Sequence, residues 1–89
     1  MRMIVEEEYG YRYWTWNVDG TRTDIQRKFN EAISVPGYYA ERDNLGGEWN
    51  EVEYSEWHKR VMDNDFDGYV HLHEDHDSEI HWRNTNEKD

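Results

Sequence analysis

The chain has 89 residues, which is room for one domain, and we expect residues 1–89 to form it. Its 21 acidic and 10 basic residues give a formal net charge of −11, which disfavours direct binding to nucleic acid or to an anionic membrane. The absence of cysteine excludes disulfides, thiolate metal sites and thiol nucleophiles, and suits a reducing cytoplasm, which is the expected location.

Residues 3–18 are predicted to form a β-hairpin, because two strand-like runs flank a turn at residues 9–10. In the second run Trp14 and Trp16 share one face, while Tyr11 and Tyr13 share the other. One face should enter the core. The other is either covered by a helix or loop, or exposed as an aromatic interaction surface.

Two helices are predicted to follow. The first runs to about Ser34, with Thr21 or Thr23 as its N-cap. Its apolar stripe comprises Ile25, Phe29, Ala32 and Ile33. The second is expected over residues 50–62, where a shorter stripe comprises Tyr54, Trp57 and Val61.

The last two segments, residues 69–74 and 78–83, alternate apolar and polar side chains and predict a second hairpin with a loop at residues 75–77. The expected cross-strand pairs on its outer face are His71 with His81, and His73 with Glu79. Together these elements predict an α+β fold in the order β-β-α-α-β-β, with four antiparallel strands and both helices packed on one face of the sheet.

Residues 63–74 resemble the calcium loop of an EF-hand, which implies oxygen ligands at fixed spacing. The candidate ligands are Asp63, Asp65, Asp67 and the closing Glu74. The next segment has strand alternation where an EF-hand has a second helix, and a strand would carry Glu74 away from the ion. The alternative is a helix end followed by an aspartate-rich turn, with Gly68 supplying backbone freedom. We therefore expect no cofactor, with calcium as the alternative.

Histidines provide a second candidate metal site. His71, His73 and His81 are within reach of one ion in the predicted hairpin, and Glu79 is a candidate fourth ligand for zinc. The alternative is that they are ordinary polar residues on an exposed face.

Nothing in the sequence predicts an enzyme: it has no Ser-His-Asp spacing, phosphate loop or glycine-rich fingerprint. The acidity indicates instead a basic partner, although solubility or salt adaptation would also explain it. Regularly spaced carboxylates can present a row of negative charge to a groove built for phosphates. The expected partner contacts are Glu6, Glu7, Glu8, Glu51, Glu53, Glu56, Asp63, Asp65 and Asp67.

In size, acidity and absence of catalytic motifs, the chain resembles the small phage-encoded inhibitors of host defence known as anti-restriction and anti-CRISPR proteins, several of which imitate nucleic acid. The resemblance implies an inhibitor that occupies a nucleic-acid-handling enzyme. These proteins share no common motif, so no residue roles carry over.

Overall fold

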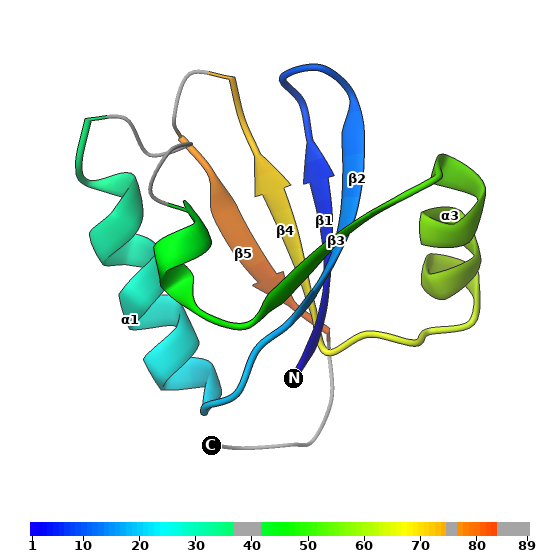
Figure 1. The fold of residues 1–89 in the computed structure, drawn as a ribbon. Coiled ribbons are helices and arrows are strands. Elements are labelled where there is room, and N and C mark those ends of the chain that lie inside the picture. The colour runs from blue at the N-terminus through cyan, green and yellow to red at the C-terminus, as the bar shows by residue number, and fades with distance from the viewer. Residues whose placement is uncertain (37–41, 75–76, 84–89) are drawn as a thin grey trace.

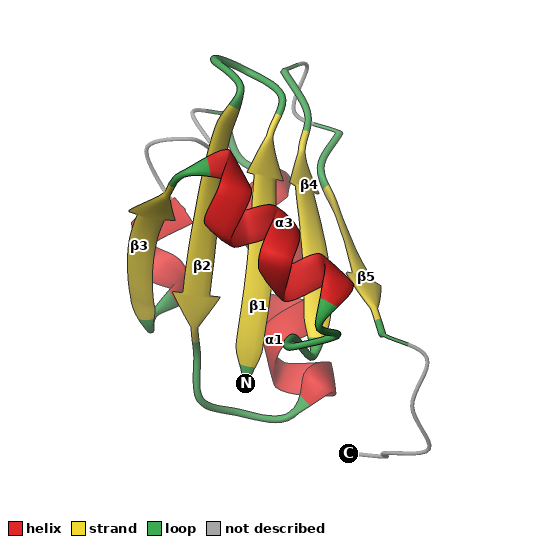
Figure 2. Cartoon of the chain, turned by 90° about the vertical axis from the view of Figure 1, so that its right-hand side faces the viewer, coloured by secondary structure: helices red, strands yellow, loops and turns green. Residues whose placement is uncertain are grey.

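The computed structural model describes residues 1–36, 42–74 and 77–83, which form an α+β fold with a sheet between two helices (Figures 1 and 2). In chain order the elements are β1 (Arg2–Glu7), β2 (Arg12–Asn17), α1 (Arg22–Ile33), a short 3-10 helix η1 (Arg42–Leu45), β3 (Glu48–Val52), α3 (Tyr54–Met62), β4 (Gly68–Leu72) and β5 (Glu79–Trp82).

The sheet has five strands in the order β3-β2-β1-β4-β5. Strands β1 and β4 are parallel, and the other neighbouring pairs are antiparallel. The prediction of four antiparallel strands is therefore wrong in two respects: β3 is an additional strand, and the two hairpins meet through a parallel pair. The segment β3-α3-β4 is a crossover connection that passes over β2 and β1, as parallel strands require.

Strand β3 occupies residues that were expected to begin the second helix. Trp49 pairs with Trp16 of β2, and the two indoles stack with centroids 4.6 Å apart and planes at 12°. This cross-strand contact favours extended backbone at the sheet edge. The helical spacing predicts the structure correctly only from Tyr54 onward.

The two helices cover opposite faces of the sheet, which corrects the prediction that both lie on one face (Figure 1). Alternation along the central strand β1 explains why both are needed. Met3 and Val5 belong to the core beneath α1, and Ile4 points to the α3 side; all three are at most 1% exposed. A strand buried on both faces has a continuous apolar run rather than an alternating one.

Helix α1 confirms the first predicted helix. Thr21 is its N-cap, and the Thr21 Oγ1 accepts a hydrogen bond from the Asp24 backbone N at 3.1 Å. Ile25 and Phe29 are fully buried against the sheet. Neither helix in the described ranges combines the length and apolar character needed to cross a membrane.

The second hairpin is present, but its register differs by two residues from the prediction. Tyr69 pairs with His81, and His71 pairs with Glu79. Beyond the paired region, the Ser78 Oγ accepts a hydrogen bond from the His73 backbone N at 3.1 Å. Of the predicted loop, residues 75 and 76 lie outside the described residues.

Candidate functional site

The aspartate-rich segment that suggested a calcium loop ends helix α3. Asn64 has a left-handed backbone (φ 56°), its N–H donates to the Val61 carbonyl at 3.2 Å, and the Asp65 N–H donates to the Arg60 carbonyl at 2.9 Å. These two bonds define a Schellman motif, in which asparagine is a common substitute for glycine. The polar sequence of this turn is therefore explained by helix termination.

Arginines contact the aspartates that follow this turn. The Asp65 carboxylate accepts a hydrogen bond from the Arg2 guanidinium, and its other oxygen lies 3.9 Å from Arg60 Nη1. Asp67 Oδ2 accepts from the Arg2 backbone N at 2.8 Å, and Asp67 Oδ1 lies 4.0 Å from Arg83 Nη2. These contacts join the ends of three strands, and a calcium ion would have to displace them.

The rest of the predicted calcium site is not brought together. Asp63 is the exposed C-cap of α3, whereas Glu74 follows the far end of β4. Gly68 begins β4 and is not one of the glycines with positive φ, so its expected role in backbone freedom is wrong. A Cβ there would lie 2.5 Å from Met3 Cε and 3.0 Å from Trp82 Cε3, so the buried Met3 side chain would have to shift to admit a larger residue.

The predicted histidine site is brought together in part. His71 and His73 lie side by side on the α3 face, with ring centroids 4.0 Å apart. His81 lies on β5 opposite Tyr69, and its Nε2 is 3.1 Å from the Glu79 carboxylate. The third member of the cluster is Glu8, which was predicted only as a partner contact. No local sequence pattern indicates that Glu8 joins the two histidines, because it is the parallel pairing of β1 with β4 that brings Glu8 beside them.

Three of the predicted partner contacts do converge. The groove at the corner of β2, β3 and α3, which we call the acid-tyrosine groove, has a volume of about 590 Å³. Its lining residues are Tyr11, Arg12, Tyr13, Glu51, Val52, Glu53, Tyr54 and Glu56. Carboxylates from the end of β3 and the first turn of α3 therefore share one concave surface.

Aromatic rings form part of this groove. Tyr13 packs edge-on against Tyr54 and contacts Trp57, with both centroid distances at 5.0 Å. Tyr11 and Tyr54 remain 82% and 54% exposed. Of the two alternatives left open for this face of β2, cover by α3 applies to Tyr13, while Tyr11 and Tyr54 remain in solvent at its margin. Exposed tyrosine is enriched at protein interaction surfaces.

Arg12 already supplies one cation to the groove. Its Nη2 donates to Glu51 Oε2 at 2.9 Å, and its guanidinium carbon lies 4.6 Å from the centroid of the Trp14 ring. The hydrogen bond from Arg12 lowers the pKa of Glu51 below its ordinary value. The groove thus binds a guanidinium of its own chain.

Substitution of Arg12 by glutamine is expected to raise the pKa of Glu51 toward its ordinary range, because the charged donor is lost. In the wild type the pair is fully formed above the ordinary glutamate pKa and weakens as the pH falls through the lowered value. Carboxyl-carbon NMR titration measures the change. An unchanged pKa of Glu51 in Arg12→Gln would contradict this pairing.

The predicted row of Glu6 to Glu8 is not one surface. Glu7 is only 4% exposed on the α1 side and accepts a hydrogen bond from Trp14 Nε1 at 2.9 Å. It is therefore not available to a partner. On the α3 side, Glu6 accepts a hydrogen bond from the Tyr69 hydroxyl, and burial together with this bond raises the pKa of Tyr69.

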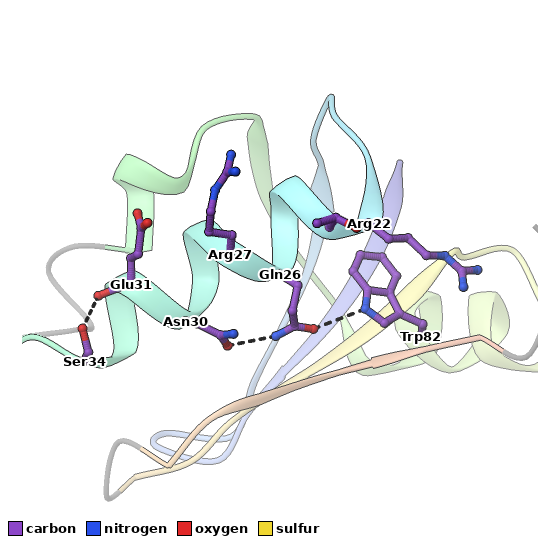
Figure 3. Close-up of a pocket in the computed structure, with 8 residues that line it drawn as sticks. Arg22, Gln26, Arg27, Asn30, Glu31, Ser34 and Trp82 are labelled. Carbon is purple, nitrogen blue, oxygen red and sulfur yellow. Dashed lines mark hydrogen bonds between the residues drawn. The ribbon is translucent and has the colours of Figure 1, made fainter. Parts of the chain in front are cut away.

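A second hollow, of about 660 Å³, lies between α1 and β5 (Figure 3). Trp82 Nε1 donates to Gln26 Oε1 at 3.3 Å, and Gln26 Nε2 donates to Asn30 Oδ1 at 3.0 Å. Arg22 lies over the Trp82 ring at 5.3 Å. These polar groups bind one another and tie the helix to the edge strand, which supports a structural role.

The described residues thus define an α+β protein with an acidic, tyrosine-bearing groove on one corner of its sheet. Comparisons with protein-family models, with curated proteins and with solved structures found no match for the chain. Its function is therefore argued from the chemistry of its surface.

Proposed function

We propose that the protein is a non-enzymatic inhibitor that binds a basic, nucleic-acid-handling protein and occupies the surface on which that partner binds phosphates. The observation that carries the proposal is the acid-tyrosine groove, whose lining includes Glu51, Glu53 and Glu56 together with the exposed Tyr54. We expect it to act in the cytoplasm, which suits a chain without cysteine.

Charge supports the choice of partner. The chain carries a formal net charge of −11, so its field attracts basic surfaces over distances of about a Debye length, roughly 8–10 Å. Such steering raises association rates and makes binding sensitive to salt. The groove concentrates three carboxylates where the partner would dock, and the tyrosines add apolar contact area that charge alone does not provide.

The Arg12–Glu51 contact within this chain is an example of the arginine–carboxylate pairing that we propose for the partner. A guanidinium donates through Nε and Nη2 to the two carboxylate oxygens, at 3.4 and 2.9 Å, while it lies over an indole ring. Arginine forks match carboxylates and phosphates with the same geometry. An arginine from a partner has two further carboxylates available in this groove, Glu53 and Glu56.

The test is affinity capture from a bacterial lysate with the wild type and with the triple variant Glu51→Lys, Glu53→Lys, Glu56→Lys. Captured partners should be basic nucleic-acid enzymes, and the variant should lose them by roughly a hundredfold, because several charge-pair contacts of about 1 kcal/mol each are reversed. The matched control is Asp19→Lys, Glu31→Lys, Asp77→Lys, which reverses three exposed carboxylates outside the groove. Either triple variant takes the formal net charge from −11 to −5, since each reversal adds two charges.

Circular dichroism should show that both triple variants remain folded, because all six positions are exposed. Equal loss of partner in both variants would show that net charge alone drives binding and would overturn the assignment to the groove. Recovery of no basic protein by the wild type would overturn the proposed function itself.

A further inference from the structure

We propose that Glu8, His71 and His73 form a binding site for a zinc ion, separate from the acid-tyrosine groove. One potential ligand atom from each residue lies within 4.8 Å of the other two. Among the described residues, these three side chains are the group of His, Cys, Asp or Glu whose ligand atoms lie close enough together to hold one metal ion.

Strand register builds the site. His71 lies in β4 and His73 directly follows its last residue, Leu72. The two are alternate residues of an extended segment, so both side chains lie on the α3 face of the sheet. Strand β1 runs parallel to β4 with Glu6 beside His71, and the pairing continues one step beyond β1 because the Glu8 backbone N donates to the Leu72 carbonyl at 2.9 Å. Glu8 is therefore brought beside His73 by backbone hydrogen bonds.

The distances suit a small tetrahedral ion. Glu8 Oε2 lies 3.2 Å from His73 Nδ1, and the two imidazole centroids are 4.0 Å apart. A tetrahedral zinc ion with bonds of about 2.0–2.1 Å separates its ligand atoms by roughly 3.3 Å. The Glu8–His73 pair already has that separation. The His71 ligand atom lies within 4.8 Å of the other two, so its side chain would have to move closer to bind the same ion.

Ligand type selects the metal. Two imidazole nitrogens and one carboxylate oxygen form a set that zinc and its neighbours in the first transition row prefer, whereas calcium prefers oxygen ligands alone. Three protein ligands leave a fourth position for water or for a donor atom from another molecule. Glu8 keeps 49% and His73 26% of its side chain exposed, so solvent reaches this site.

Neighbouring histidines offer matched controls. His81 lies on the same face but faces Glu79, with 3.1 Å between its Nε2 and the carboxylate. His58 lies on α3, where its ring packs against Tyr54. Neither belongs to the cluster, so substitution of either should leave zinc binding intact.

The experiment is calorimetric titration of the full chain with Zn²⁺, together with Co²⁺ as a spectroscopic probe of coordination. We expect one Zn²⁺ per chain and a higher melting temperature with Zn²⁺ than with chelator, because an ion that binds only the folded state stabilises it. Glu8→Gln, His71→Gln and His73→Gln should each weaken affinity by about tenfold or more, since even changes outside the ligand set cost that much. His81→Gln and His58→Gln should bind as the wild type does.

Proton NMR of the wild-type imidazoles keeps the proposal testable if a variant fails to fold. Addition of Zn²⁺ should shift or broaden the signals of His71 and His73 and leave those of His58 and His81 in place. No heat up to millimolar Zn²⁺, affinity unchanged in all three cluster variants, or equal loss in the two control variants would each overturn the site.

Discussion

Replacement of Arg42 by methionine is expected to lower the free energy of unfolding by about 3–5 kcal/mol, because it leaves a buried carboxylate without its cation. The Glu7 and Arg42 side chains are only 5% and 15% exposed, and Arg42 Nη1 donates to Glu7 Oε2 at 3.3 Å. The guanidinium also lies over the rings of Trp14 and Trp49. Urea denaturation followed by tryptophan fluorescence measures the loss.

Two control variants separate the charge from the volume of the side chain. Arg12→Met removes a guanidinium from the same Trp14 ring, but Arg12 pairs with Glu51 in solvent, so its loss should destabilise the fold much less than the loss of Arg42. The double variant Glu7→Gln, Arg42→Met removes both buried charges and should be more stable than Arg42→Met alone. Equal stability of the single and double Arg42 variants would contradict a buried ion pair.

Gly47→Ala is expected to destabilise the fold by about 2–5 kcal/mol, from a left-handed backbone strain of about 1–2 kcal/mol and an overpacking cost of about 1–3 kcal/mol. Gly47 has φ +83° immediately before β3. A Cβ at this position would lie 2.3 Å from the Asn17 carbonyl oxygen and 2.9 Å from Trp16 Nε1. The first of these contacts is with backbone, which has little room to move.

Gly46→Ala is the matched control for this prediction. Gly46 also has φ +83°, but a Cβ there would meet nothing within 4 Å. The difference between the two variants therefore isolates the contact from the backbone strain, and only the strain cost of about 1–2 kcal/mol is expected for Gly46→Ala. Equal destabilisation in thermal unfolding would show that the close approach of β3 to β2 is not what requires Gly47.

Local features of the sequence predicted the structure well where neighbours in the chain decide it. The candidate caps Thr21 and Thr23, of which Thr21 is used, and the stripe of Ile25 and Phe29 locate α1, because both signals depend on residues three or four apart. The alternation of aromatic residues in β2 predicted that both of its faces carry rings, and α3 covers the face that bears Tyr13. These elements need no knowledge of distant contacts.

Features set by pairing between distant segments were not predictable. Strand β3 forms because Trp49 stacks on Trp16, more than thirty positions earlier in the chain. The parallel pairing of β1 with β4 brings Glu8 close to His73. Alternation along β1 buries Glu7 on the α1 side, although Glu6, Glu7 and Glu8 were expected to form one partner surface. The aspartates at residues 63–67 match the spacing of a calcium loop, but they lie in and after the Schellman motif that ends α3, and Asp65 pairs with Arg2.

The most direct test of the proposed function measures the affinity of the captured partner for this protein at about 50 and 200 mM salt, with and without competing duplex DNA. We expect the affinity to fall by more than about tenfold between the two salt concentrations, because charge pairs carry the contact. We also expect the duplex to displace the protein, because both would occupy one phosphate-binding surface. Binding that is indifferent to salt and to DNA would contradict the proposal.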